Sequence, residues 1–238
     1  MQTVVILVEP AGPLNVGSVA RLCANFDVDE LRLVNPRCDP TEADALRMAV
    51  HASPLLERAS RHATLESALA DCRRVVATCG RIDHGAIPLR TPDEALNWLM
   101  GGDGPMAVVF GREDSGLTND ELRLCQRVLT LHSSSHYASL NLSHAVAVVL
   151  HDMARLKQGR HGSQQSSPDP APAPQLSALL DDAADLLLEA GFLLPHTRSA
   201  RMAKVRDLLQ RASSRSEEVA MLRGMVRQLR WAIRAERP

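Results

Sequence analysis

The stretch VVILVEPAGPLNVGSVARLCAN, residues 4–25, decides the fold. It opens with an apolar run, Val4 to Val8, of the kind that forms a buried strand. Turn-forming residues follow, and a helical pattern then covers 16–25. A near-continuous apolar strand that leads into a helix is the building unit of a parallel sheet with helices on both faces.

The same alternation continues as far as residue 157. Apolar runs predict further strands at 31–34, 75–78, 107–110 and 128–131. Between and after them, helical patterns cover 42–50, 65–72, 92–100, 119–124 and 140–157. We therefore predict an α/β fold with a mostly parallel sheet and helices on both faces.

A stretch rich in proline separates this region from a helical one. Residues 159–175, GRHGSQQSSPDPAPAPQ, can neither continue a helix nor build a core, and they predict a flexible linker. Helical patterns follow at 176–190, 198–211 and 217–234. The sequence thus predicts a larger α/β domain over 1–158, a linker over 159–175 and a small all-α domain over 176–238.

Charge is distributed unevenly along the chain. The net charge is −1, but residues 1–160 hold 16 Lys and Arg against 19 Asp and Glu, whereas residues 196–238 hold 11 against 4. Binding of a polyanion such as RNA is one interpretation of the basic C-terminal region, and the solvated faces of amphipathic helices are the other. Arg223, Arg227 and Arg230 lie outside the apolar stripe of the last helix.

Composition narrows the environment of the protein. No apolar run approaches the roughly 20 residues that a membrane-spanning helix needs, and the N-terminus does not resemble a signal peptide. The five cysteines have neither a C-x-x-C pair nor a regular spacing, which favours free thiols over a disulfide or zinc framework. We expect a cytoplasmic protein.

Three loops carry residues that could do chemistry. The first, Asn15-x-Gly17-Ser18-x-x-Arg21, lacks the dinucleotide fingerprint G-x-G-x-x-G. Asn15 is a capable helix N-cap, and Ser18 and Arg21 share nearly one helix face, so they could meet a phosphate or a sugar. The alternative is an ordinary helix start with one exposed arginine.

The second loop, Gly111 to Leu117, follows an apolar strand directly. Its two glycines would let the backbone approach a ligand closely, and Thr118 or Asn119 would cap the next helix. The alternative is a polar turn.

The third loop precedes the long helix, which Ser139 or Asn141 could cap. Its histidines show no H-E-x-x-H spacing, so we expect no metal site.

Taken in order and spacing, these loops resemble the three signature motifs of the SPOUT RNA 2′-O-ribose methyltransferases of the TrmH/TrmJ family. The matching residues are Asn15-x-Gly17-Ser18-x-x-Arg21, Gly111-x-Glu113-x-x-Gly116-Leu117 and Ser139-Leu140-Asn141-Leu142. The linker and helical extension are similar to those of the TrmJ branch, which methylates nucleotide 32 in the tRNA anticodon loop. The resemblance spans nearly the whole chain.

This resemblance implies a deep trefoil knot at the end of the catalytic domain, S-adenosylmethionine as the methyl donor and a homodimer. The implied cofactor-binding residues are Thr78, Cys79, Gly80, Gly111, Leu131, Ala138, Ser139 and Leu140. The implied catalytic residues are Arg21, Asn15, Glu113, Ser139 and Asn141. The RNA-binding residues that we expect are Ser18, Arg21, Arg112, Arg223, Arg227 and Arg230. Cys79-Gly80 stand where the family leads us to expect two small residues such as Ser-Ala.

The resemblance leads us to expect a tRNA 2′-O-methyltransferase in which Arg21 remains protonated. Arg21 would hold the phosphate of the target nucleotide and stabilise the developing alkoxide, while Glu113 would orient Arg21 or cap its loop. Two alternatives stay open. One is methylation of ribosomal RNA or of another tRNA position, and the other is a non-catalytic RNA-binding protein with the same fold.

Overall fold

The structure, a computed structural model, describes residues 2–80, 87–131, 133–134, 136, 139–159 and 169–235. The chain divides into two compact units, Met1–Ser167 and Pro168–Pro238. We call them unit 1 and unit 2.

In the described residues, unit 1 is built on a seven-stranded sheet whose neighbouring strands all run parallel. The strand order is β3-β2-β1-β6-β4-β7-β5. The strands are β1 (Thr3–Val8), β2 (Glu30–Val34), β3 (Ser60–His62), β4 (Arg74–Thr78), β5 (Leu89–Arg90), β6 (Met106–Phe110) and β7 (Arg127–Leu129). Because β1 and β6 lie at the centre, the loops that follow them meet at one edge of the sheet.

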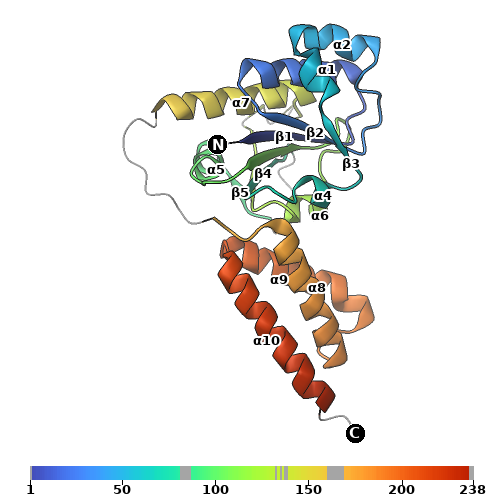
Figure 1. Cartoon of the computed structure of the whole chain (residues 1–238), viewed down its shortest axis with the longest axis vertical. Coiled ribbons are helices and arrows are strands. Elements are labelled where there is room, and N and C mark those ends of the chain that lie inside the picture. Colours follow the sequence, from blue (N-terminus) through green and yellow to red (C-terminus); the bar gives the residue numbers. More distant parts are fainter. Residues whose placement is uncertain are drawn as a thin grey trace. The chain divides into compact units, whose positions relative to one another are not determined.

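Helices cover both faces of this sheet (Figure 1). They are α1 (Pro13–Asn25), α2 (Ala43–Ala49), α3 (Ser53–Glu57), α4 (Leu65–Ala68), α5 (Pro92–Leu99), α6 (Asn119–Arg123) and α7 (Leu142–Gly159), with a 3-10 turn, η1 (Val50–Ala52). Val5 and Leu7 of β1 pack in one core cluster with α1, α5 and α7. Val4 and Ile6 pack in a second cluster with α4 and α6. The alternation of side chains along a strand explains why the apolar run is continuous.

Unit 2 is a small helical domain. It comprises α8 (Ala173–Glu189), the 3-10 turn η2 (Pro195–Thr197), α9 (Arg198–Arg211) and α10 (Ser216–Ala235). Its core gathers Leu176, Leu179 and Leu180 of α8 against Val219 of α10. After α8, Gly191 takes φ +76°, the left-handed conformation that commonly ends a helix.

The linker expected over 159–175 extends too far into unit 2. Helix α8 begins at Ala173, and Ala171 is buried in the core of unit 2. Pro174 is compatible with the helix because it lies in the first turn, where a backbone N–H has no intrahelical acceptor.

The predicted α/β sheet is confirmed, and each of the five expected strands exists to within two residues. Strands β3 and β5 and helix α3 were missed. The two strands lie at the edges of the sheet and have three and two residues, so they are too short for a periodic pattern.

Candidate functional site

A cavity of about 430 Å³ opens at the C-terminal ends of β4, β6 and β7. This is the edge at which open α/β sheets bind ligands, and the volume is in the range of small-molecule sites. Its walls come from three segments that are distant in sequence. They are Thr78, Cys79 and Gly80 after β4; Phe110 to Leu117 after β6; and Leu131, Ser139, Leu140, Leu142 and Ala145 around the start of α7.

The loop after β6 forms a tight hairpin. The N–H of Gly116 donates to the carbonyl of Arg112 at 3.0 Å, and the N–H of Arg112 donates to the carbonyl of Gly116 at 3.3 Å. A Cβ on Gly111 would overlap the backbone of Gly116 and Leu117. Gly116 has φ +69°. Both glycines are therefore required by the turn, which presents its backbone to the cavity.

Glu113 ties this hairpin to the loop between β1 and α1. Its carboxylate accepts hydrogen bonds from the backbone N–H groups of Ala11 at 3.1 Å and Gly12 at 3.0 Å, and from the Asn15 side-chain amide at 3.2 Å. The expectation that Asn15 is the N-cap is wrong. Helix α1 begins at Pro13 with Gly12 as its N-cap, and no side chain caps it locally. Glu113, about a hundred residues away, satisfies backbone donors there instead.

Asn141 connects the third loop to the same network. Its side-chain amide N–H donates to the side-chain Oδ1 of Asn15 at 3.0 Å. Its own carbonyl oxygen accepts from the Ser143 N–H at 2.9 Å, which caps α7. The predicted capping by Asn141 is confirmed, and the chain Glu113–Asn15–Asn141 joins all three motif loops.

Glu113 is ionised at neutral pH. Burial alone would raise the pKa of Glu113, but the hydrogen bonds from Ala11, Asn15 and Gly12 hold it below its ordinary value. A carboxylate with three donors and a lowered pKa is a poor proton acceptor. The environment of Glu113 therefore suits a positioning role better than general-base catalysis.

Arg112 is held by two carboxylates. Its guanidinium makes two bonds to Glu9, at 3.0 and 2.6 Å, two to Glu121, both at 2.9 Å, and one to the carbonyl of Gly116 at 3.2 Å. These bonds use all five guanidinium N–H donors. The expected RNA contact of Arg112 stays a prediction, and the structure shows its donors engaged in these bonds and its side chain only 14% exposed. Arg112 clamps the hairpin to β1 and α6.

The residues of the first motif have two different roles, because Gly17 packs against a neighbouring helix and Arg21 is exposed to solvent. A Cβ on Gly17 would overlap the carbonyl oxygen of Ala45 in α2 and lie 2.9 Å from Met48 Cβ. Gly17 therefore allows α1 and α2 to pack closely and does not face a ligand. Arg21 is exposed on α1 and Ser18 is partly buried. Neither is among the residues that line the cavity.

The structure gathers most of the expected cofactor-binding set around one cavity. Thr78, Cys79, Gly80, Gly111, Leu131, Ser139 and Leu140 all line it, whereas Ala138 lies outside the described residues. Sequence reasoning missed several contributors. Glu9 and Glu121 carry no motif of their own, and Phe110 and Ala145 were taken only as strand and helix residues. Leu142 was placed in the third motif but not in the cofactor-binding set. A carboxylate at the end of a strand, such as Glu9, was the available signal.

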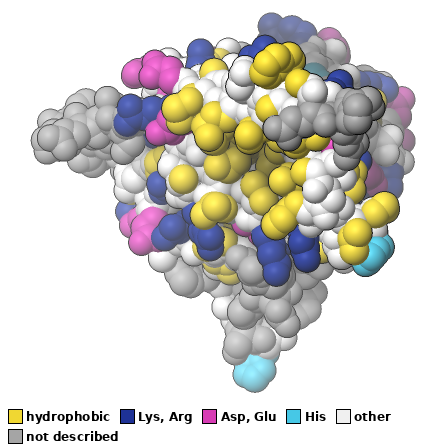
Figure 2. Space-filling view, turned by 90° about the horizontal axis from the view of Figure 1, so that it is seen from below, with side chains coloured by type: hydrophobic (Ala, Val, Ile, Leu, Met, Phe, Trp, Pro, Cys, Tyr) yellow, Lys and Arg dark blue, Asp and Glu magenta, His cyan; other side chains and the backbone are white. Residues whose placement is uncertain are grey.

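Two of the three expected RNA-binding arginines of unit 2 make intramolecular contacts. The Nε of Arg223 lies 2.8 Å from an Asp182 carboxylate oxygen, and Arg230 donates to the Asp182 carbonyl at 2.6 Å. Arg227 projects from the same helix. Figure 2 shows dark blue basic side chains beside yellow hydrophobic ones on the face that it presents.

No group of three His, Cys, Asp or Glu side chains in the described part of the chain could hold a metal ion. In the same residues, no helix is both long enough and apolar enough to cross a membrane.

Comparisons with known proteins give consistent similarities. Residues 2–151 match the model of the SpoU rRNA Methylase family, and residues 175–238 match the C-terminal domain of the tRNA methyltransferase TrmJ. The tRNA (cytidine/uridine-2′-O-)-methyltransferase TrmJ of Klebsiella pneumoniae is 36% identical, with 93% of each chain covered.

Solved structures agree. The crystal structure of TrmJ from Z. mobilis ZM4 has a TM-score of 0.84 at 31% identity and covers 96% of this chain and 99% of its own. The SpoU methyltransferase AviRb from Streptomyces viridochromogenes, solved in complex with AdoMet, is 18% identical. It has a TM-score of 0.53 over 66% of this chain and 60% of its own, and shows the fold alone.

Proposed function

The chain belongs to the SpoU rRNA Methylase family and ends in a TrmJ C-terminal domain, and we propose that it methylates the ribose 2′-oxygen of nucleotide 32, a cytidine or uridine, in the anticodon loop of tRNA. One observation carries the proposal. The three motif loops are joined by the hydrogen-bonded chain Glu113–Asn15–Asn141 beside a ligand-sized cavity.

The choice of tRNA over ribosomal RNA rests on the relatives. Although the family model is named for rRNA, the relatives that match over 93% of their own length are named for tRNA. The C-terminal domain that they share with this chain supports the same substrate.

The cavity suits S-adenosylmethionine. Among the described residues, no atom lies within 4 Å of where a Cβ on Gly80 would be, so the Gly80 backbone is accessible to a ligand. The hairpin after β6 offers further backbone groups. Leu117, Leu131, Leu140 and Leu142 give an apolar lining to part of the pocket. Thr78, Cys79, Gly80, Gly111, Leu131, Ser139 and Leu140 would hold the cofactor. When bound, it supplies a methyl group on a positively charged sulfonium that leaves as a neutral thioether.

The protein must then align the ribose 2′-hydroxyl and help it lose its proton. Arg21 is exposed, and a guanidinium is a cation with planar donors, so Arg21 can hold the phosphate of the target nucleotide and stabilise the developing alkoxide. The low pKa of Glu113 argues that the proton leaves to phosphate or water. Asn15 and Asn141 fix the position of the α1 and α7 ends between which the substrate would lie.

We propose that RNA affinity comes mainly from arginine contacts to phosphate. Arg21 and Ser18 would contact the target nucleotide, and Arg227 of unit 2, with rearrangement of Arg223 and Arg230, would add phosphate contacts. The homodimer, the trefoil knot and the cytoplasmic location that the resemblance and the cysteines predict remain part of this proposal.

Methylation of a total tRNA mixture with labelled S-adenosylmethionine, followed by mapping of the modified nucleotide, tests the proposal. Label on nucleotide 32 is the expected result. Label on ribosomal RNA or on another tRNA position would replace the substrate and keep the reaction. No affinity for S-adenosylhomocysteine would favour the non-catalytic RNA-binding alternative.

A further inference from the structure

Seven described arginines of unit 1 form ion pairs with carboxylates. In the part of the chain that the structure describes, the paired arginines are Arg32, Arg37, Arg47, Arg61, Arg112, Arg123 and Arg155. For Arg90 and Arg127, as for Arg21, Arg58 and Arg73, no carboxylate of the described residues lies within ion-pair distance. What distinguishes Arg90 and Arg127 is that they lie on neighbouring strands, β5 and β7, so that two positive charges gather with no ion-paired carboxylate among the described residues.

The register of the sheet places these side chains together. Arg127 of β7 is paired with Val76 of β4, two residues after Arg74. Arg90 of β5 is paired with Leu129 of β7, two residues after Arg127. Residues two apart on a strand, and residues paired across parallel strands, point to the same face. Arg74, Arg127 and Arg90 therefore share one face of the sheet, next to α5.

Trp98 of α5 organises two of these guanidinium groups. The guanidinium carbon of Arg127 lies 4.5 Å from the centroid of the Trp98 ring, and that of Arg74 lies 5.0 Å from it. Arg74 is buried and donates to the Trp98 carbonyl, so it serves the end of α5. Arg127 is half-buried and donates to the Glu94 carbonyl at 3.3 Å. Stacking on the indole fixes the plane of its guanidinium in advance.

The acidic groups on α5 are engaged elsewhere. Asp93 pairs with Arg155, and the carboxylate of Glu94 closes a capping box with Thr91. Burial, together with the neighbouring Arg90 and Arg74, lowers the pKa of Arg127 to about 10, so it stays protonated at neutral pH. Crowded like charges of this kind are relieved by an anion.

We propose that Arg90 and Arg127 form a phosphate-binding site for the RNA backbone at the β5 edge of the sheet. The inference rests on the proposed function, since tRNA is the source of the phosphate. Neither arginine lines the cavity after β4 and β6, so the site is separate from the one that would hold the cofactor. A phosphodiester between the two guanidinium groups would gain charge-assisted hydrogen bonds. It would add affinity without reading a base.

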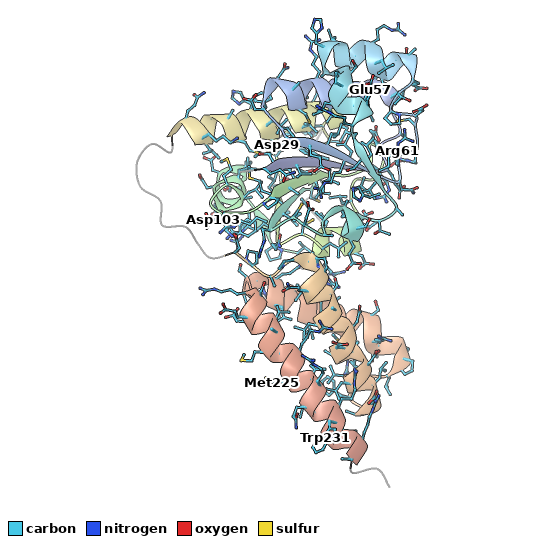
Figure 3. The ribbon with its side chains drawn as sticks, viewed as in Figure 1. Asp29, Glu57, Arg61, Asp103, Met225 and Trp231 are labelled. Carbon is cyan, nitrogen blue, oxygen red and sulfur yellow. The ribbon has the colours of Figure 1, made fainter. Side chains whose placement is uncertain are left out.

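Equilibrium binding of fluorescein-labelled tRNA, followed by anisotropy across a salt series, tests this site with the full chain. Arg90→Gln is the main variant because Arg90 is exposed. The matched control is Arg58→Gln. Arg58 is exposed at the end of α3, and among the described residues its side chain donates to the Pro54 carbonyl alone. It lies beside Glu57, which Figure 3 labels.

We expect Arg90→Gln to raise the Kd for tRNA about fivefold, the upper end for an exposed ion pair. The slope of log K against log salt should become shallower by about 1, as for one lost phosphate contact. The KM for tRNA should rise while kcat and the affinity for S-adenosylhomocysteine stay the same, and Arg58→Gln should change neither Kd nor slope. Arg127→Lys, which keeps the charge but loses the stacked fork, should also weaken tRNA binding.

Different results would overturn the phosphate-binding site and the proposed function. If wild-type protein binds and methylates tRNA while Arg90→Gln and Arg127→Lys match it in Kd and salt slope, the site is overturned and the proposed function stands. If wild-type protein neither binds nor methylates tRNA, both are overturned.

Discussion

Replacing Arg112 with methionine should destabilise unit 1. The substitution keeps an apolar stem but leaves Glu9 and Glu121, 27% and 17% exposed, side by side without the cation that binds both. Removing one partner from a buried ion pair costs about 3–5 kcal/mol, and partial exposure reduces the cost here to about 2–3 kcal/mol. For a chain of this size, the melting temperature should fall by about 4–10 °C.

Urea unfolding followed by fluorescence measures this loss. Trp98 reports on unit 1 if Trp231, which is exposed on α10 and labelled in Figure 3, is first replaced with phenylalanine. The control is Arg47→Met, because the Arg47 side chain is 76% exposed and pairs with Asp44 on the same helix. That change should cost less than about 0.5 kcal/mol. Equal unfolding midpoints for Arg112→Met and Arg47→Met would refute the stabilising role of the Arg112 ion pairs with Glu9 and Glu121.

The pH dependence gives a second check on the clamp. The hydrogen bond from Arg112 holds the pKa of Glu9 below its ordinary 4.5. Burial would raise the pKa of Glu121, but Arg112 and Thr118 hold it below 4.5 as well. A carboxyl group with a lowered pKa stabilises the folded state above its unfolded pKa, and this stability is lost as the pH falls through the folded pKa. The difference between wild type and Arg112→Met should therefore be full above pH 4.5 and shrink below it.

Three further changes test other parts of the site. Arg21→Ala should lower kcat by about a hundredfold or more, and Arg21→Lys should lower it by about tenfold. Neither change should alter the affinity for S-adenosylhomocysteine measured by calorimetry. Near-wild-type turnover by Arg21→Lys would show that a forked contact is unnecessary. Asn141→Asp should retain the acceptor that caps α7 and lose the donor to Asn15, so methylation should fall while the melting temperature stays the same. If Asn141→Asp and Asn141→Ala lowered the melting temperature equally, the separate roles of the two groups would be contradicted. Gly17→Ala should lower the free energy of unfolding in urea by about 2–3 kcal/mol, because its Cβ would push α1 from α2. The control, Gly224→Ala, has open space in α10 and should be neutral or stabilising by up to about 1 kcal/mol. Similar effects from both changes would rule out the close approach of α1 and α2.

Local features of this chain could be read from its sequence. The strands at 4–8 and 107–110 are buried on both faces, and such burial leaves a continuous apolar run. Capping by Thr118 and Asn141 was predictable because a cap bonds to a backbone group only two or three residues away. The order of the motif loops along the chain also sufficed to indicate the family.

The tertiary structure alone decided how these loops are held. Asn15 looked like an N-cap, yet Glu113 satisfies the start of α1 from another loop, and Gly17 serves the packing of α1 on α2. Arg112 looked free for RNA, but Glu9 and Glu121 accept four of its five donors and the Gly116 carbonyl accepts the fifth. Each of these partners is separated by many residues or by a turn that sequence spacing does not describe. Periodicity reports which face of an element is buried, but only the fold determines which charged group meets which partner.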